Sequence, residues 1–172
     1  MGLRGNLLHV GCGGEALPFW AEGSNETRLD IDPQYNPDYV ASMVDMGDVG
    51  QYDIVFSSHC LEHVYPHEAK QALLEMKRVL VPGGVNITIV PDLEDVKPTH
   101  DTVYECEGTK ICGLDILYGL ARALEFNPYM AHKNGFTVDL LKQEFKDAGF
   151  KNITGIRIKE LHSIMVTGKK CN

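Results

Sequence analysis

The sequence predicts an α/β protein with a Rossmann-like, doubly wound and mostly parallel sheet that ends in an antiparallel hairpin. Two observations predict this fold class. Short apolar runs alternate with helical patterns along most of the chain, and two strand-like runs with almost no residues between them lie near its C-terminal end. Alternating strands and helices are typical of a parallel sheet with helices on both faces, whereas closely spaced strands pair antiparallel. We therefore expect a three-layer α/β/α domain.

Five short runs predict the parallel strands, and the fourth of them is rich in β-branched and aromatic residues. They lie at 6–10, 27–31, 39–42, 52–57 and 85–90. Only a few residues, three of them turn-formers, separate the second run from the third. The crossover helix between these two strands is therefore expected to be very short or missing. The terminal hairpin is expected at 153–159 and 163–167.

Four segments show helical patterns. A short helix is expected at 15–21, with Pro18 in its first turn. The segment 67–80 has one apolar face, formed by Ala69, Leu73, Met76 and Leu80. A third helix is expected at 114–125. A fourth is expected to begin after Thr137 and to end at Gly149.

The chain is expected to form one domain, residues 1–172, because its 172 residues suit a single core. The stretch 93–135 interrupts the alternation of strands and helices, opening with polar and acidic residues before its helical pattern. We expect it to be an insertion that covers the carboxyl edge of the sheet like a lid.

Composition excludes several classes of protein. The net charge is −8 and the Lys and Arg residues are scattered, which argues against a nucleic-acid partner. No apolar run is long enough to span a bilayer, and the start of the sequence lacks a signal-peptide pattern. Five cysteines without a CxxC pair argue against a zinc ribbon and favour a reducing compartment. We therefore expect a cytoplasmic protein with no membrane partner.

Ligands of open α/β sheets bind beyond the carboxyl ends of the strands. The turn Gly11 to Gly14 follows the first strand directly, and glycines there let the backbone approach a ligand closely. Asp30 ends the second strand, where a carboxylate can accept hydrogen bonds from a ribose diol. The turn alone also fits a dinucleotide-binding dehydrogenase, with Ala16 at the last position of GxGxxG, or a turn with no ligand. Asp32 and Asp30 could each be a solvated acid.

Six segments, in order and over nearly the whole chain, resemble motifs of class I S-adenosylmethionine-dependent methyltransferases, of the type 11 kind. LLHVGCGG resembles their glycine-rich first motif, LDIDP their ribose-binding strand, and VDM the motif whose acid holds the adenine amino group. YDIVFSSHCLEHV, LLEMKRVLVPGGVNITIVPD and HKNGFTVDLLKQEFKDAGF resemble their fourth strand, the RVLKPGG stretch and the helix before the terminal hairpin. The dehydrogenase family lacks the RVLKPGG stretch and the terminal hairpin.

The resemblance implies S-adenosylmethionine as the cofactor. The residues that it implies for cofactor binding are His9, Gly11, Cys12, Gly13, Glu15, Asp30, Ile31, Asp45, Met46, Ser57 and Ser58. Two of these depart from the family pattern. His9 stands where the family usually has an acid that helps to bind the methionine part of the cofactor. Glu15 replaces a glycine, and it either approaches the cofactor amine in place of that acid or only favours the start of a helix.

Three histidines, His59, His63 and His132, are the candidates for a catalytic base, which is needed only for an acceptor that carries a proton. If the segment after the fourth strand is helical, His59 and His63 share a face, with Glu62 adjacent. A related group of O-methyltransferases binds a divalent cation at this segment. The segment is therefore a structural link to the sheet, a metal site, or a base or substrate contact, and we assign no metal ligands.

Three functional hypotheses follow. The first is methyl transfer to an O, N or C atom of a small organic acceptor, without a nucleic-acid or membrane partner. The second is methylation of a protein or nucleic acid. The third is a non-catalytic relative used for binding or assembly, which His9 and Glu15 keep open. Self-association as a homodimer is also left open. Aromatic residues of the stretch 93–135 form either an apolar lid over the acceptor or a local satellite core.

Overall fold

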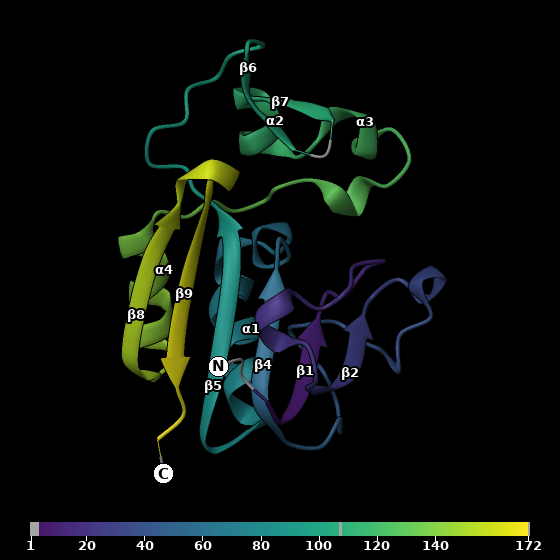
Figure 1. The fold of residues 1–172 in the computed structure, drawn as a ribbon, viewed down its shortest axis with the longest axis vertical. Coiled ribbons are helices and arrows are strands. Elements are labelled where there is room, and N and C mark those ends of the chain that lie inside the picture. Colours follow the sequence, from purple (N-terminus) through teal and green to yellow (C-terminus); the bar gives the residue numbers. More distant parts are fainter. Residues whose placement is uncertain (1–3, 107, 172) are drawn as a thin grey trace.

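A central seven-stranded sheet organises the computed structural model, which describes residues 4–106 and 108–171 (Figure 1). Its strand order is β3-β2-β1-β4-β5-β9-β8. The first five strands pair in parallel, and β9 pairs antiparallel with both β5 and β8. The strands are β1 (Asn6–Val10), β2 (Asn25–Asp30), β3 (Tyr39–Val40), β4 (Tyr52–Ser58), β5 (Leu80–Pro91), β8 (Lys151–Ile158) and β9 (Ser163–Lys169). The predicted Rossmann-like, mostly parallel sheet and its terminal hairpin are confirmed, but the expected third layer of helices is reduced to a 3-10 turn.

Two long helices, α1 (Pro66–Arg78) and α4 (Val138–Asp147), cover the same face of the sheet (Figure 1). The predicted apolar face of α1 is confirmed, since Ala69, Leu73 and Met76 are fully buried. Thr137 caps α4 as predicted, because its hydroxyl accepts the Leu140 N–H, and Gly149 ends it with φ of +82°. These helices and the inward side chains of the strands form the larger of two apolar cores.

The opposite face of the sheet has a much thinner cover. The predicted helix at 15–21 is wrong, because only Phe19–Ala21 forms a single 3-10 turn, η1. Pro18 lies before that turn in an extended conformation, which a helix interior cannot contain. Trp20 and Ala21 nevertheless pack on Leu7, Ile54, Phe56 and Ile87 to form the smaller core.

The connection from β2 to β3 agrees with the prediction of a very short crossover. It contains only one 3-10 turn, η2 (Pro33–Tyr35). Asp32 precedes this turn, and its carboxylate accepts the backbone N–H of Gln34. The helix that usually connects two parallel strands is thus replaced by a turn here. The carboxyl ends of β1 and β2 therefore stay accessible.

The insertion lies beyond the carboxyl ends of the parallel strands, as expected for a lid (Figure 1). Its hairpin, β6 (Thr102–Cys106) and β7 (Thr109–Cys112), was not predicted. Residue 107 of the insertion lies outside the described residues. Instead of one helix at 114–125, it has α2 (Gly113–Tyr118), α3 (Ala121–Leu124) and a 3-10 turn, η4 (Pro128–Met130).

Gly119 explains why the predicted helix is divided. Its φ of +97° lies in the left-handed region, which ends α2. A Cβ atom at this position would lie 2.3 Å from the carbonyl oxygen of Met130. The close packing of Gly119 against Met130 therefore outweighs the helix propensity of the surrounding residues, and the helix is interrupted at Gly119. Among the described residues, no helix is both long and apolar enough to cross a membrane.

Candidate functional site

A cavity of about 450 Å³ lies at the carboxyl ends of β1, β2 and β4. Its walls come from the glycine turn after β1, the end of β2, the segment 41–44, the end of β4 and the insertion. The volume lies in the usual range for a small-molecule site, about 300–1,000 Å³. This is also the position at which open α/β sheets bind ligands.

Gly11 begins the glycine turn and tolerates no side chain. Its φ is +66°, and a Cβ atom there would lie 2.0 Å from Cys60 Sγ. Burial raises the pKa of the Cys60 thiol well above its ordinary value, so the thiol is neutral. Cys12 and Cys60 both line the cavity and behave there as small apolar groups.

Asp30 holds the glycine turn from the neighbouring strand. Its Oδ2 accepts the Gly13 N–H at 2.8 Å, and its Oδ1 accepts the Asp32 N–H at 2.9 Å. The residue is 8% exposed and lines the cavity. Because each carboxylate oxygen has two lone pairs, both oxygens can accept one more hydrogen bond from a ligand.

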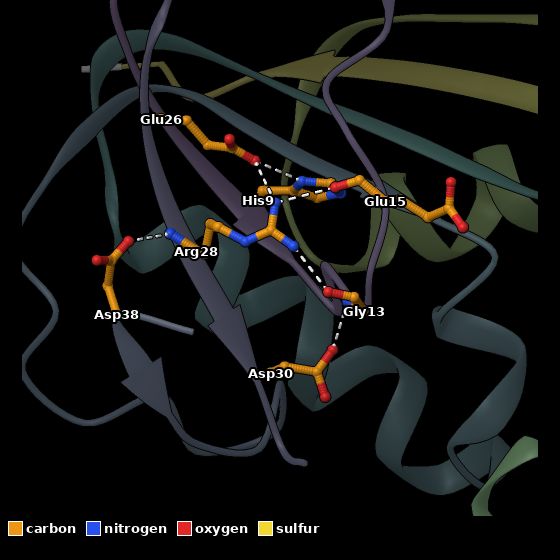
Figure 2. A network of polar contacts seen from close by, with 7 residues as sticks. All are labelled: His9, Gly13, Glu15, Glu26, Arg28, Asp30 and Asp38. Atoms are coloured by element: carbon orange, nitrogen blue, oxygen red, sulfur yellow. Dashed lines mark hydrogen bonds and ion pairs between the residues drawn. The ribbon is translucent and has the colours of Figure 1, made fainter. Parts of the chain in front are cut away.

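A polar network supports the turn from the other side (Figure 2). Arg28 on β2 donates to the carbonyl oxygen of Gly13 at 2.7 Å and to that of Glu15 at 2.9 Å. Glu26 lies 3.3 Å from Arg28 and 2.8 Å from Nδ1 of His9. Arg28 therefore fixes both ends of the segment from Gly13 to Glu15 relative to β2.

His9 takes part in this network and does not line the cavity, which corrects the prediction for this residue. Its side chain is buried on the sheet face beside Phe56, with ring centroids 5.1 Å apart. Burial lowers the pKa of His9, although the contact with Glu26 opposes the shift. Side chains alternate between the two faces of a strand, and His9 therefore points at the smaller core. Its ring is a neutral structural group there.

Most of the predicted cofactor residues do line the cavity. They are Gly11, Cys12, Gly13, Glu15, Asp30, Ile31 and Ser58. Ser57 does not, because it points into the protein, where its hydroxyl donates to Thr88 Oγ1. Sequence reasoning missed Tyr35, Ser42, Met43 and Val44, which follow β2 and β3 and also line the cavity.

Asp45 and Met46 lie outside the cavity lining, which corrects their prediction. Asp45 turns back toward Ser42, whose carbonyl accepts the Asp45 N–H at 3.1 Å. Met46 is buried in the larger core, and its N–H donates to the Glu75 carboxylate. The part of this segment that faces the cavity is thus Met43 and Val44, slightly earlier in the chain.

The histidines after β4 do not share a helix face. Leu61–His63 is one 3-10 turn, η3, and His59 precedes it with φ of +49°. His59 and His63 line the cavity, whereas His132 lies on the far side of His63, with ring centroids 5.1 Å apart. The structure therefore brings all three predicted histidines to one region.

Glu62 lies between these histidines and is buried. Burial alone would raise the pKa of Glu62, but His59 and His63 outweigh it and lower the pKa. Burial lowers the pKa of His132. The insertion docks on this segment, because the Glu62 carbonyl oxygen accepts the N–H groups of Lys133 and Asn134.

The insertion also supplies part of the cavity wall. Asn127, Tyr129, Met130 and Lys133 line the cavity. Lys133 Nζ lies 5.1 Å from the centre of the Tyr65 ring, within the range of a cation–π contact. The insertion therefore forms part of the cavity wall, and its side chains Tyr129 and Met130 face the same space as the glycine turn.

The methyltransferase domain family matches residues 8–88, just under half of the chain. A search of curated proteins finds no match. Solved structures share the fold at low sequence identity. A Bordetella parapertussis protein described as a possible exported protein is 14% identical with a TM-score of 0.65, over 98% of this chain and 62% of that one.

Two structures from Burkholderia thailandensis are also similar. One is 1,6-didemethyltoxoflavin-N1-methyltransferase with 1,6-didemethyltoxoflavin and S-adenosylhomocysteine, at 14% identity, TM-score 0.66, 98% of this chain and 72% of that one. The other is an O-methyltransferase family protein, at 12% identity, TM-score 0.63, 98% of this chain and 52% of that one. The chain thus spans less than two thirds of the length of some of these structures.

Proposed function

We propose that this chain is a class I methyltransferase and that it transfers a methyl group from S-adenosylmethionine to a small organic acceptor. One observation carries the proposal. A cavity of ligand size lies at the carboxyl edge of the sheet, and the glycine turn and Asp30 form its wall. Solved methyltransferase structures, including that of 1,6-didemethyltoxoflavin-N1-methyltransferase, share this fold.

Asp30 is the residue that we propose for the ribose of the cofactor. Its carboxylate already orders the Gly13 N–H, and its remaining lone pairs can accept both hydroxyls of the diol. For the adenine ring we propose the apolar side chains of Ile31, Met43 and Val44. Ile31 is 55% exposed although it lines the cavity, so a bound ring would remove its side chain from water.

Methyl transfer from a sulfonium is an in-line displacement. A bond forms between the acceptor atom and the methyl carbon as the carbon–sulfur bond breaks, and the electron pair goes to sulfur. The product thioether is neutral, so no residue has to protonate it. Alignment of the reactants can supply about 7–11 kcal/mol of the acceleration. Tyr129 and Met130 help by keeping water out of the cavity.

A proton on the acceptor needs a base, and His59 and His63 are the side chains that we propose for it. Both line the cavity. Nδ1 of His63 lies 3.2 Å from the Ala131 carbonyl oxygen, so Nδ1 carries the proton and Nε2 is free to accept another. A base of this kind contributes about 10²–10⁴-fold to the rate.

Calorimetric titration with S-adenosylmethionine and S-adenosylhomocysteine tests the proposal. We expect micromolar binding to the wild type and at least a tenfold loss in Asp30→Asn, since a hydrogen bond to a charged group contributes about 1.5–3 kcal/mol. Asp45→Asn is the matched control and should bind normally, because Asp45 lies outside the cavity lining.

A second function is favoured by His9, which stands where related enzymes have an acid and packs beside Phe56 away from the cavity. That function is binding or assembly without catalysis. If a folded wild-type sample binds neither compound, the methyltransferase proposal is wrong and the second function takes its place.

A further inference from the structure

Glu62 carries a buried carboxylate that has no hydrogen-bond partner among the described residues. The residue is 1% exposed, and this holds for both Oε1 and Oε2. Nδ1 of His59 lies 3.5 Å from Oε1, which is longer than an ordinary hydrogen bond. Buried polar groups are nearly always hydrogen-bonded, and an ionised carboxylate is costly to bury unless it is paired or binds a metal. The environment of Glu62 therefore calls for a cationic ligand.

Two histidines beside Glu62 are oriented by backbone carbonyls. Nδ1 of His63 lies 3.2 Å from the Ala131 oxygen, and Nδ1 of His132 lies 2.9 Å from the Ile116 oxygen. A carbonyl oxygen only accepts, so each neutral ring carries its proton on Nδ1 and presents the lone pair of Nε2. Metal-binding histidines are commonly oriented in this way by a carbonyl or carboxylate.

The three side chains are close enough to share one ion. One ligand atom from each of Glu62, His63 and His132 lies within 4.8 Å of the other two. Some point therefore lies within about 2.8 Å of all three atoms (4.8 Å divided by √3). Zinc bonds to nitrogen and oxygen measure about 2.0–2.2 Å. Shifts below 1 Å, which side-chain rotation allows, would therefore complete the coordination.

We propose that Glu62, His63 and His132 form a binding site for a d-block divalent cation such as zinc or cobalt. Two imidazoles and one carboxylate suit these ions better than calcium or magnesium, which prefer oxygen ligands. The site joins η3, which follows the central strand β4, to the insertion. A bound ion would thus also fix the insertion in position over the cavity.

The location of the ion site suggests how an acceptor would bind, and this part of the inference rests on the proposed methyl transfer. His63 lines the cavity, while Glu62 and His132 line a second, smaller space. Three protein ligands leave a coordination position for a non-protein ligand. An acceptor with a hydroxyl or carboxylate oxygen would reach the ion from the cavity side of His63, and His59 would then be the remaining base.

Cobalt chloride tests the site directly, because its visible absorption reports coordination. Chelator-treated full-length protein is titrated with Co²⁺ in the absorption cell and with Zn²⁺ in the calorimeter. We expect one ion per chain, and a loss of affinity of at least tenfold in Glu62→Gln and in His132→Ala. His67→Ala and His100→Ala are the matched controls, because both histidines are exposed, and they should bind the ion like the wild type.

Circular dichroism melting identifies any variant that fails to fold, and Glu62→Gln keeps the size of the side chain. Binding that is equal in Glu62→Gln and the wild type would overturn the proposal, as would a folded wild type that binds no ion. Titration of the metal-free protein with S-adenosylhomocysteine separates this result from a failure of the proposed function, which it tests independently.

Discussion

Arg28 fixes the glycine turn through two charge-assisted hydrogen bonds, to the carbonyl oxygens of Gly13 and Glu15. The turn has no following helix to hold it, so these bonds replace part of the support that a helix would give. Arg28→Ala should therefore lower the affinity for S-adenosylhomocysteine about tenfold and the free energy of unfolding by about 1.5–3 kcal/mol. Calorimetry and urea unfolding measure the two effects.

Two further variants make this measurement specific. Arg28→Lys should recover little of the affinity, because an ammonium group lacks the planar fork that reaches two acceptors. Arg122→Ala removes an exposed arginine that donates to Thr109 within the insertion, and it should leave the affinity unchanged. If Arg28→Ala binds as the wild type does, the turn keeps its shape without Arg28 and the argument fails.

His9 should make stability depend on pH. Burial lowers the pKa of His9 in the folded chain below the ordinary value of 6.5, which applies to the unfolded chain. At a pH between the folded and the unfolded pKa, the unfolded chain therefore binds a proton that the folded chain does not. The free energy of unfolding should therefore fall as the pH drops from 7.5 through 6.5. In His9→Gln this group no longer titrates, and the fall between pH 7.5 and 5.5 should be smaller. Urea unfolding at both pH values gives the comparison, and equal falls in the two proteins would contradict the expectation.

At the scale of elements, one 3-10 turn replaces a helix on one face of the sheet. Trp20 contacts Phe56 edge to face, with ring centroids 5.2 Å apart, and covers the smaller core. Trp20→Ala should lower the free energy of unfolding by about 2–4 kcal/mol, somewhat below the cost for a fully buried tryptophan. Phe19→Ala is the neighbouring control. Phe19 is 83% exposed, so its loss should change stability by less than about 0.5 kcal/mol. Urea unfolding of both variants gives the two free energies. Equal losses of stability would show that Trp20 adds nothing to the smaller core.

The sequence predicted those elements whose pattern is local. The apolar face of α1 and the cap of α4 follow from residues a few positions apart, and both are confirmed. The helix expected at 15–21 is wrong, and the helix expected at 114–125 is divided into two. The local sequence pattern does not show the causes of these differences. Pro18 ends one, and the close approach of Gly119 to Met130 divides the other. Such approaches depend on tertiary structure.

At the scale of the whole molecule, the site was predictable where it follows strands directly. Gly11, Asp30 and Ser58 line the cavity because carboxyl strand ends meet at one edge of a parallel sheet. The direction of a side chain within a strand was harder, since His9 and Ser57 point into the two cores. The contact of His132 with Glu62 was not predictable, because the path of the insertion brings together residues far apart in the sequence.

The charge of the whole molecule bears on the class of acceptor. With 24 acidic and 16 basic residues, the chain has a net charge of −8. Non-specific binding to nucleic acids depends on Lys and Arg neutralising phosphates, and it has dissociation constants of about 10⁻⁴–10⁻⁶ M. We expect no binding of a labelled DNA duplex or of transfer RNA at 50 mM salt and protein concentrations of about 10 μM, measured by fluorescence anisotropy. Micromolar binding that weakens steeply as salt is raised would contradict a small organic acceptor and favour a polyanion. Absence of binding, together with binding of S-adenosylhomocysteine by the same sample, would direct the search for acceptors to small molecules that fit beside the cofactor.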